Sequence, residues 1–159
     1  LKLVPDDKIS EVKELAEYGP EPLEKDFTLR YFTEALLKKK NMPIKLALME
    51  NKLVVGIGNI YSDEILFHAH VKPSRKVGSL GLTEVRDIYN QIGPVLKKGI
   101  EAKGSSVGDF IRPDGSWGSM GKFHFVYGRK KQPCKRCGTL IQSVKLGGRT
   151  SSFCSKCQK

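Results

Sequence analysis

The sequence lacks several features that define common classes of protein. It has no apolar run close to the roughly 18 residues that a membrane-spanning helix needs, and residues 1–7 are too short and too acidic for a secretory signal. Hydrophobic residues make up 39% of the chain, and its 16 glycines raise that share to about 49%, which excludes a wholly disordered protein. We therefore expect a soluble, cytoplasmic protein without a membrane partner, whose 159 residues form one domain or two small ones.

Acidic residues are absent from the last quarter of the chain. Residues 122–159 contain ten Lys and Arg side chains and no Asp or Glu, so they carry most of the net charge of +11. Such a block is typical of a surface that binds a polyanion, because each cation that neutralises a phosphate releases a counterion. A solvated, disordered basic tail is the alternative on charge alone.

All four cysteines lie inside this basic block, as Cys134-x2-Cys137 and Cys154-x2-Cys157. The distance between the two pairs falls within the spacing of a structural zinc site, and two residues between paired cysteines let both thiolates face one metal ion. Two disulfides are the alternative, but a cytoplasmic chain keeps its thiols reduced. The sequence thus predicts one structural zinc ion with these four ligands.

The segment between the cysteine pairs has the pattern of a β-hairpin. Strands are expected at 139–144 and 149–153, with a turn at 146–148. A hairpin of this size does not fold alone, so the metal would hold it together. Basic side chains on such a rigid scaffold favour recognition of phosphates.

The residues before the hairpin show mainly helical periodicity. A short capped helix is expected from Ser10, and Gly56 and Gly58 allow an irregular double turn before Asn59. That turn leaves backbone N–H groups free to bind an anion, although a connection that only packs is an equal alternative. The glycine-rich segment 104–121 predicts a mobile loop. Four further helices are expected, at 25–40, 44–49, 59–70 and 83–103.

Five motifs follow one another along nearly the whole chain. They are YGPEPL at 18–23, KLVVGIGNIY at 52–61, VYGR at 126–129, a Pro-Cys-x2-Cys-Gly-Thr-x-Ile segment at 133–141, and the segment from Arg149 to Gln158. In this order they resemble the carboxyl-terminal part of the bacterial formamidopyrimidine-DNA glycosylase family, which removes 8-oxoguanine and cleaves at abasic sites.

The resemblance implies a mainly α fold, with a helix-two-turns-helix domain at 1–121 and a β-hairpin zinc finger at 122–159. It implies a monomer that binds double-stranded DNA containing damaged bases or abasic sites. Residues 1–20 would lead in from an amino-terminal catalytic domain of the same polypeptide, and 104–121 would form a flexible loop over an extruded base. The resemblance assigns DNA binding to seven residues: Lys45, Lys52, Gly58, Asn59, Tyr127, Arg129 and Arg149.

The family's nucleophile is the amine of an amino-terminal proline, followed by a general-acid glutamate. This chain begins at Leu1 and matches neither, so no residue in it is assigned as catalytic. We expect the DNA-binding part of a base-excision-repair hydrolase, cut from a longer chain, that binds damaged DNA without cutting it. Two alternatives remain: a free-standing zinc-ribbon module that binds nucleic acid, and an enzyme that uses an internal lysine.

Other candidates for chemistry are weaker. His68, His70 and His124 show no obvious Ser or Cys partner in the sequence, and a lone histidine is more often a surface or core residue. The adjacent carboxylates of Asp63 and Glu64 are interpreted as favourable charges near the start of a helix.

Overall fold

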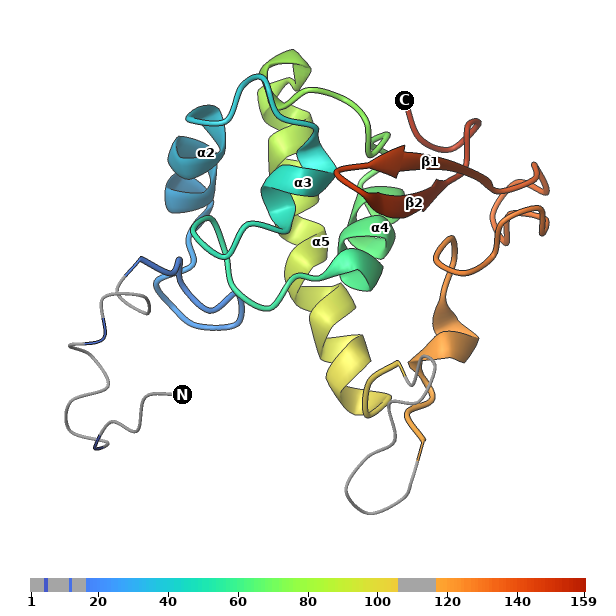
Figure 1. Cartoon of the computed structure of the whole chain (residues 1–159), viewed down its shortest axis with the longest axis horizontal. Coiled ribbons are helices and arrows are strands. Elements are labelled where there is room, and N and C mark those ends of the chain that lie inside the picture. The colour runs from blue at the N-terminus through green and yellow to red at the C-terminus, as the bar shows by residue number, and fades with distance from the viewer. Residues whose placement is uncertain (1–4, 6–11, 13–16, 106–116) are drawn as a thin grey trace.

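A computed structural model describes residues 5, 12, 17–105 and 117–159 of the chain (Figure 1). Most of the helix expected from Ser10 and residues 106–116 of the glycine-rich segment lie outside these ranges. No helix in the described part is both long and apolar enough to cross a membrane. The described residues form four α-helices, α2 (Leu29–Leu37), α3 (Ile44–Leu48), α4 (Asn59–His68) and α5 (Leu82–Glu101), and two strands, β1 (Gln142–Leu146) and β2 (Arg149–Phe153).

Local capping sets where the helices begin. The Thr28 hydroxyl accepts a hydrogen bond from the N–H of Tyr31 at 3.2 Å, so α2 starts at Leu29. The expected helix at 25–40 is therefore too long at its amino end, where residues 24–28 form turns that bring Phe27 into the core. At the start of α5, the Glu84 carboxylate accepts the N–H of Gly81 at 2.9 Å.

The helices share one apolar core. The long helix α5 packs against α4 and α2, and α3 packs against α4 (Figure 1). At Gly99 a Cβ atom would collide with the Tyr61 hydroxyl, so glycine permits the close approach of α4 and α5. The fully buried side chains of this core include Phe32, Leu36, Ile44, Leu48, Leu53, Ile65, Leu66, Ile88 and Ile92.

The two strands form an antiparallel hairpin in which Leu146 pairs with Arg149 and Gln142 with Phe153. Gly147 and Gly148, with φ of 53° and 76°, make the two-residue turn. The first strand begins at Gln142, three residues later than expected. The reason is that Thr139 accepts the N–H of Cys134 at 2.9 Å, so residues 139–141 belong to the cysteine turn.

The hairpin lies directly on the helices. Its turn reaches α3, where a Cβ on Gly147 would come within 2.9 Å of the Leu46 side chain. Strand β2 runs beside α4 (Figure 1). A second apolar cluster joins Phe67 of α4 to Val126, Ile141 and the buried cysteines. The helical part and the hairpin are therefore packed together, with α4 between them.

Candidate nucleic-acid interface

The four cysteines come together at the open end of the hairpin. Their sulfur atoms all lie within 4.8 Å of one another, with 4.0 Å between Cys134 and Cys157 and 3.5 Å between Cys137 and Cys154. Zn–S bonds of about 2.3 Å in a tetrahedron place sulfur atoms about 3.8 Å apart. The geometry therefore fits one zinc ion, and the predicted cofactor is confirmed.

The four thiols do not ionise equally when no cation lies among them. Hydrogen bonds from Thr139 lower the pKa of Cys137 to about 6. Desolvation and the neighbouring thiols raise the pKa of Cys157 to about 12, because several thiolates cannot carry charge side by side. A divalent cation removes that repulsion. Because the unfolded chain has no such site, the free energy of binding the cation stabilises the folded hairpin.

The start of α4 has the properties of an anion site. Gly58 precedes the helix and offers no side-chain cap, and the first turn contains no acidic residue. The first N–H groups of the helix therefore keep their partial positive charge. The Oδ1 atom of Asn59 is buried beside them and has no hydrogen-bond partner within the described part of the chain, but as an acceptor it does not itself bind an anion. An anion at this position would meet unpaired backbone donors.

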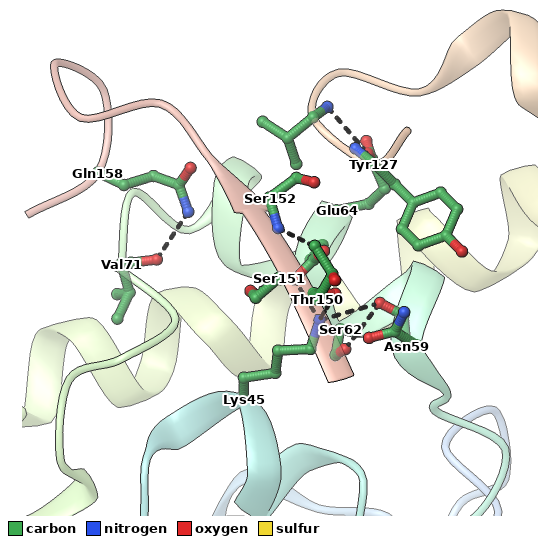
Figure 2. A network of polar contacts seen from close by, with 12 residues as sticks. Lys45, Asn59, Ser62, Glu64, Val71, Tyr127, Thr150, Ser151, Ser152 and Gln158 are labelled. Atoms are coloured by element: carbon green, nitrogen blue, oxygen red, sulfur yellow. Dashed lines mark hydrogen bonds and ion pairs between the residues drawn. The ribbon is translucent and has the colours of Figure 1, made fainter. Parts of the chain in front are cut away.

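The sequence suggested that Asp63 acts on the helix dipole. In the structure it instead points into a buried contact with the hairpin. Its carboxylate lies 2.6 Å from the Lys45 ammonium and accepts hydrogen bonds from the Ser151 hydroxyl at 2.7 Å and the Ser152 N–H at 2.9 Å. Figure 2 shows Lys45 reaching between α4 and strand β2, where these residues meet. Asp63 thus ties α3, α4 and β2 together.

Glu64 has a second, separate role. Its two carboxylate oxygens accept the backbone N–H groups of Phe125, Val126 and Tyr127 at 2.8, 3.0 and 2.9 Å. Glu64 itself is 1% exposed. This side chain therefore fixes the strap, which we define as residues 120–127, against α4 (Figure 2).

The predicted DNA-binding residues lie in different environments. Lys45 is completely buried, and its Nζ also lies 3.4 Å from the Asn59 carbonyl and 3.5 Å from that of Thr150. Burial lowers the pKa of Lys45, Asp63 opposes that shift, and the nearby charge of Arg149 adds to it. Arg149 is exposed beside the hairpin turn. Lys45, Asn59 and Arg149 are thus brought together, with Arg149 on the outside.

Three other predicted residues make no direct contact with this group in the described part of the chain. Lys52 is exposed and pairs with Glu17 at 2.6 Å. The Arg129 guanidinium donates to the carbonyls of Phe125 and Pro133, both at 2.9 Å, so it links the strap to the cysteine turn. Tyr127 is partly buried at the end of the strap. Direct contacts of these three residues with DNA stay predictions.

One histidine differs from expectation. His124 has a serine partner, since its Nε2 lies 3.0 Å from the Ser105 hydroxyl, and no pattern in the sequence indicated this pair. Burial lowers the pKa of His124. His68 packs its ring edge-on against Phe67 and Phe125. These contacts give both histidines structural roles.

Sequence reasoning missed the most connected side chains of the site. Asp63 and Glu64 belong to a run from Ser62 to Phe67 in which every residue is buried. A helix with two adjacent carboxylates inside such a run is unusual, because ionised groups are rarely buried without partners. That burial is known only from the structure, so no signal in the sequence identifies Asp63 and Glu64 as partners of another segment.

Comparisons with known proteins agree with this geometry. The family described as "Formamidopyrimidine-DNA glycosylase H2TH domain" matches residues 18–110, and "Zinc finger found in FPG and IleRS" matches residues 131–159. Formamidopyrimidine-DNA glycosylase of Bacillus subtilis (strain 168) is 43% identical over 144 residues, covering 91% of this chain and 52% of that protein. The Streptococcus pneumoniae TIGR4 enzyme is 45% identical over 141 residues, covering 89% and 51%.

Solved structures show the same relationship. The MutM (Fpg) protein of Thermus thermophilus superimposes with a TM-score of 0.89 at 37% identity, over 98% of this chain and 59% of that one. Lactococcus lactis Fpg in complex with DNA containing an abasic site has a TM-score of 0.87 at 34% identity, over 98% and 57%. The chain thus spans about half the length of the curated relatives it matches.

Proposed function

We propose a function for this chain on the premise that it belongs to the formamidopyrimidine-DNA glycosylase family. It is the damaged-DNA-binding region of a base-excision-repair enzyme that acts as a glycosylase and an abasic-site lyase. The substrate class is double-stranded DNA containing oxidised purines or abasic sites. The complexes of Lactococcus lactis Fpg with DNA that contains Fapy-dG or an abasic site support this assignment. We further propose that the region acts as a monomer in the bacterial cytoplasm.

The observation that carries the proposal is the meeting of two phosphate-binding elements in surroundings that do not repel a phosphate. The uncapped start of α4 at Asn59 supplies backbone donors, the exposed Arg149 supplies a guanidinium beside them, and residues 122–159 contain no acidic residue to repel a phosphate. Charge-assisted hydrogen bonds from Arg to phosphate are among the strongest in proteins. DNA backbone binding follows from this arrangement without any contact to bases.

DNA binding would be shared between two domains, a helix-two-turns-helix domain at 1–121 and a zinc finger at 122–159. The two family matches, at 18–110 and 131–159, support that division. Residues 104–121 would cover the extruded base, and 1–20 would join the catalytic domain of the same polypeptide. Zinc, held by the four cysteines, supplies structure and no chemistry to the reaction.

A polypeptide of residues 1–159 alone should bind DNA without cutting it, because the family's proline amine and glutamate have no counterpart in it. A free-standing zinc-ribbon module is less favoured, because the zinc finger is packed on a domain that matches the glycosylase family over residues 18–110. An internal reactive lysine is the second alternative; Lys45 does not fit it, since it is fully buried on Asp63, and the trapping experiment below tests the other lysines.

The test is a fluorescence anisotropy titration with a duplex that contains one abasic-site analogue, run beside an undamaged duplex. Borohydride trapping on a natural abasic site accompanies it. We expect binding that weakens steeply with salt and no covalent adduct. Absence of binding at low salt would reject the proposal, and an adduct would show that an amine within residues 1–159 is reactive.

A further inference from the structure

The groups proposed to contact DNA come from parts of the chain that are far apart in sequence. Asn59 begins α4, Tyr127 ends the strap, and Arg149 begins β2. Phosphates along a DNA strand have a fixed spacing, so these groups can bind together only if their separation is also fixed. The structure must therefore hold the strap and the hairpin at set positions relative to the start of α4.

Two consecutive carboxylates provide that connection. Neighbouring residues of an α-helix point about 100° apart, so Asp63 and Glu64 leave the same turn of α4 in different directions. Asp63 meets Ser151 and Ser152 on β2, next to Arg149, and Glu64 meets the N–H groups of the strap up to Tyr127. Each carboxylate lies about one turn beyond Asn59 on the same helix.

Both contacts are more directional than packing requires. Asp63 is 0% and Glu64 1% exposed, and together they accept five hydrogen bonds from the hairpin and the strap. Apolar side chains would hold two surfaces together at lower cost, because burying a carboxylate carries a desolvation penalty. Hydrogen bonds, in contrast, define position and register, since they weaken steeply away from ideal geometry.

We propose that Asp63 and Glu64 are positioning residues, which set Arg149 and Tyr127 at a fixed distance from Asn59 so that the three contact one run of phosphates together. The inference rests on the proposed DNA-binding function. It predicts that loss of either carboxylate weakens DNA binding even though neither touches DNA. Ordinary electrostatics predicts the opposite sign, since removing a negative charge from a DNA-binding protein strengthens binding.

The experiment compares Asp63→Asn and Glu64→Gln with Asp87→Asn, a matched control that removes an exposed carboxylate on α5. Each protein is prepared with zinc, and its helix content and zinc content are measured first. Affinity for the abasic-site duplex is then measured as a function of salt. We expect both test variants to bind about tenfold more weakly, the loss of one charge-assisted contact, and the control to bind equally or more tightly.

A second comparison separates positioning from general loosening. Arg149→Ala is added to the wild-type and Asp63→Asn backgrounds. If Asp63 positions Arg149, the alanine substitution costs less affinity, and lowers the salt slope less, in the Asp63→Asn background. An equal effect in both backgrounds would overturn the inference.

Should Asp63→Asn fail to fold, Ser151→Ala takes its place, because it removes only one donor to the same carboxylate. Wild-type affinity in Ser151→Ala and Glu64→Gln would also overturn the inference. Failure of the wild-type protein to bind the duplex would instead reject the proposed function, so the two failures are distinct.

Discussion

Lys45→Met isolates the energetic role of the buried ion pair. Methionine has a similar length and fills the space of the lysine stem, but it leaves Asp63 buried without its cation. Removing one partner of a buried pair costs about 3–5 kcal/mol, because the remaining charge is uncompensated. Ser151 and Ser152 still donate to Asp63, which places the expected loss near the lower end, about 3 kcal/mol.

The assay is urea unfolding of the zinc-loaded protein, followed by circular dichroism. With a denaturant dependence of about 2 kcal/mol per molar urea, a loss of about 3 kcal/mol lowers the midpoint by about 1.5 M. Lys45→Met/Asp63→Asn serves as the control, because asparagine is neutral and still accepts a hydrogen bond. We expect this double variant to be more stable than Lys45→Met alone.

The pH dependence provides an independent check. Burial raises the pKa of Asp63 and the Lys45 ammonium opposes that shift, so the pKa of Asp63 rises further in Lys45→Met. A carboxyl whose pKa is higher folded than unfolded loses stability as pH rises through the folded pKa. The destabilisation of Lys45→Met is therefore largest near neutral pH and smaller in mild acid. An unchanged urea midpoint at pH 7 would refute the reasoning.

The remaining predictions concern the metal, the hairpin arginine and a surface ion pair. Removal of zinc by a chelator should abolish most DNA binding, because the hairpin loses its fold; full binding by metal-free protein would contradict a structural zinc site. Arg149→Ala should weaken duplex binding by about 1–3 kcal/mol in an anisotropy titration, and equal affinity would remove Arg149 from the interface. Burial raises the pKa of Glu84, but Arg75 and the Gly81 N–H outweigh it, so that pKa lies below its usual range. Glu84→Gln should therefore lower the free energy of unfolding by about 0.5–1 kcal/mol at pH 7, with the difference shrinking as pH falls through the pKa of Glu84; a constant difference from pH 7 to pH 3 would argue against it.

Local signals were sufficient to predict much of the fold from the sequence. The cysteine spacing identified four ligands that the structure brings together, and Gly147 with Gly148 marked the hairpin turn. The start of α4 at Asn59 followed from the glycines before it. Each of these features depends on residues close together in the chain.

The parts that could not be predicted depend on distant partners. Asp63 meets Ser151 across 88 positions, and Glu64 meets Phe125 across 61. No periodicity or spacing rule relates such residues, and a carboxylate beside a helix start is more often explained by the dipole. The resemblance assigned Lys45 to DNA binding, which stays a prediction, but nothing in the sequence indicated that Asp63 on another helix holds its side chain inside.

The burial of α4 on nearly every side affects the order in which the chain can fold. Residues 62–67 are all buried in the finished molecule, yet the strap and the hairpin that cover part of them follow some sixty to ninety residues later. At a synthesis rate of about 5–20 residues per second, the strap and the hairpin are made several seconds after α4. The surface of α4 that is still uncovered carries Asp63 and Glu64, which water solvates well, beside the apolar ring of Phe67. The two carboxylates that later bind the strap and the hairpin thus also oppose aggregation of α4 before those segments are made.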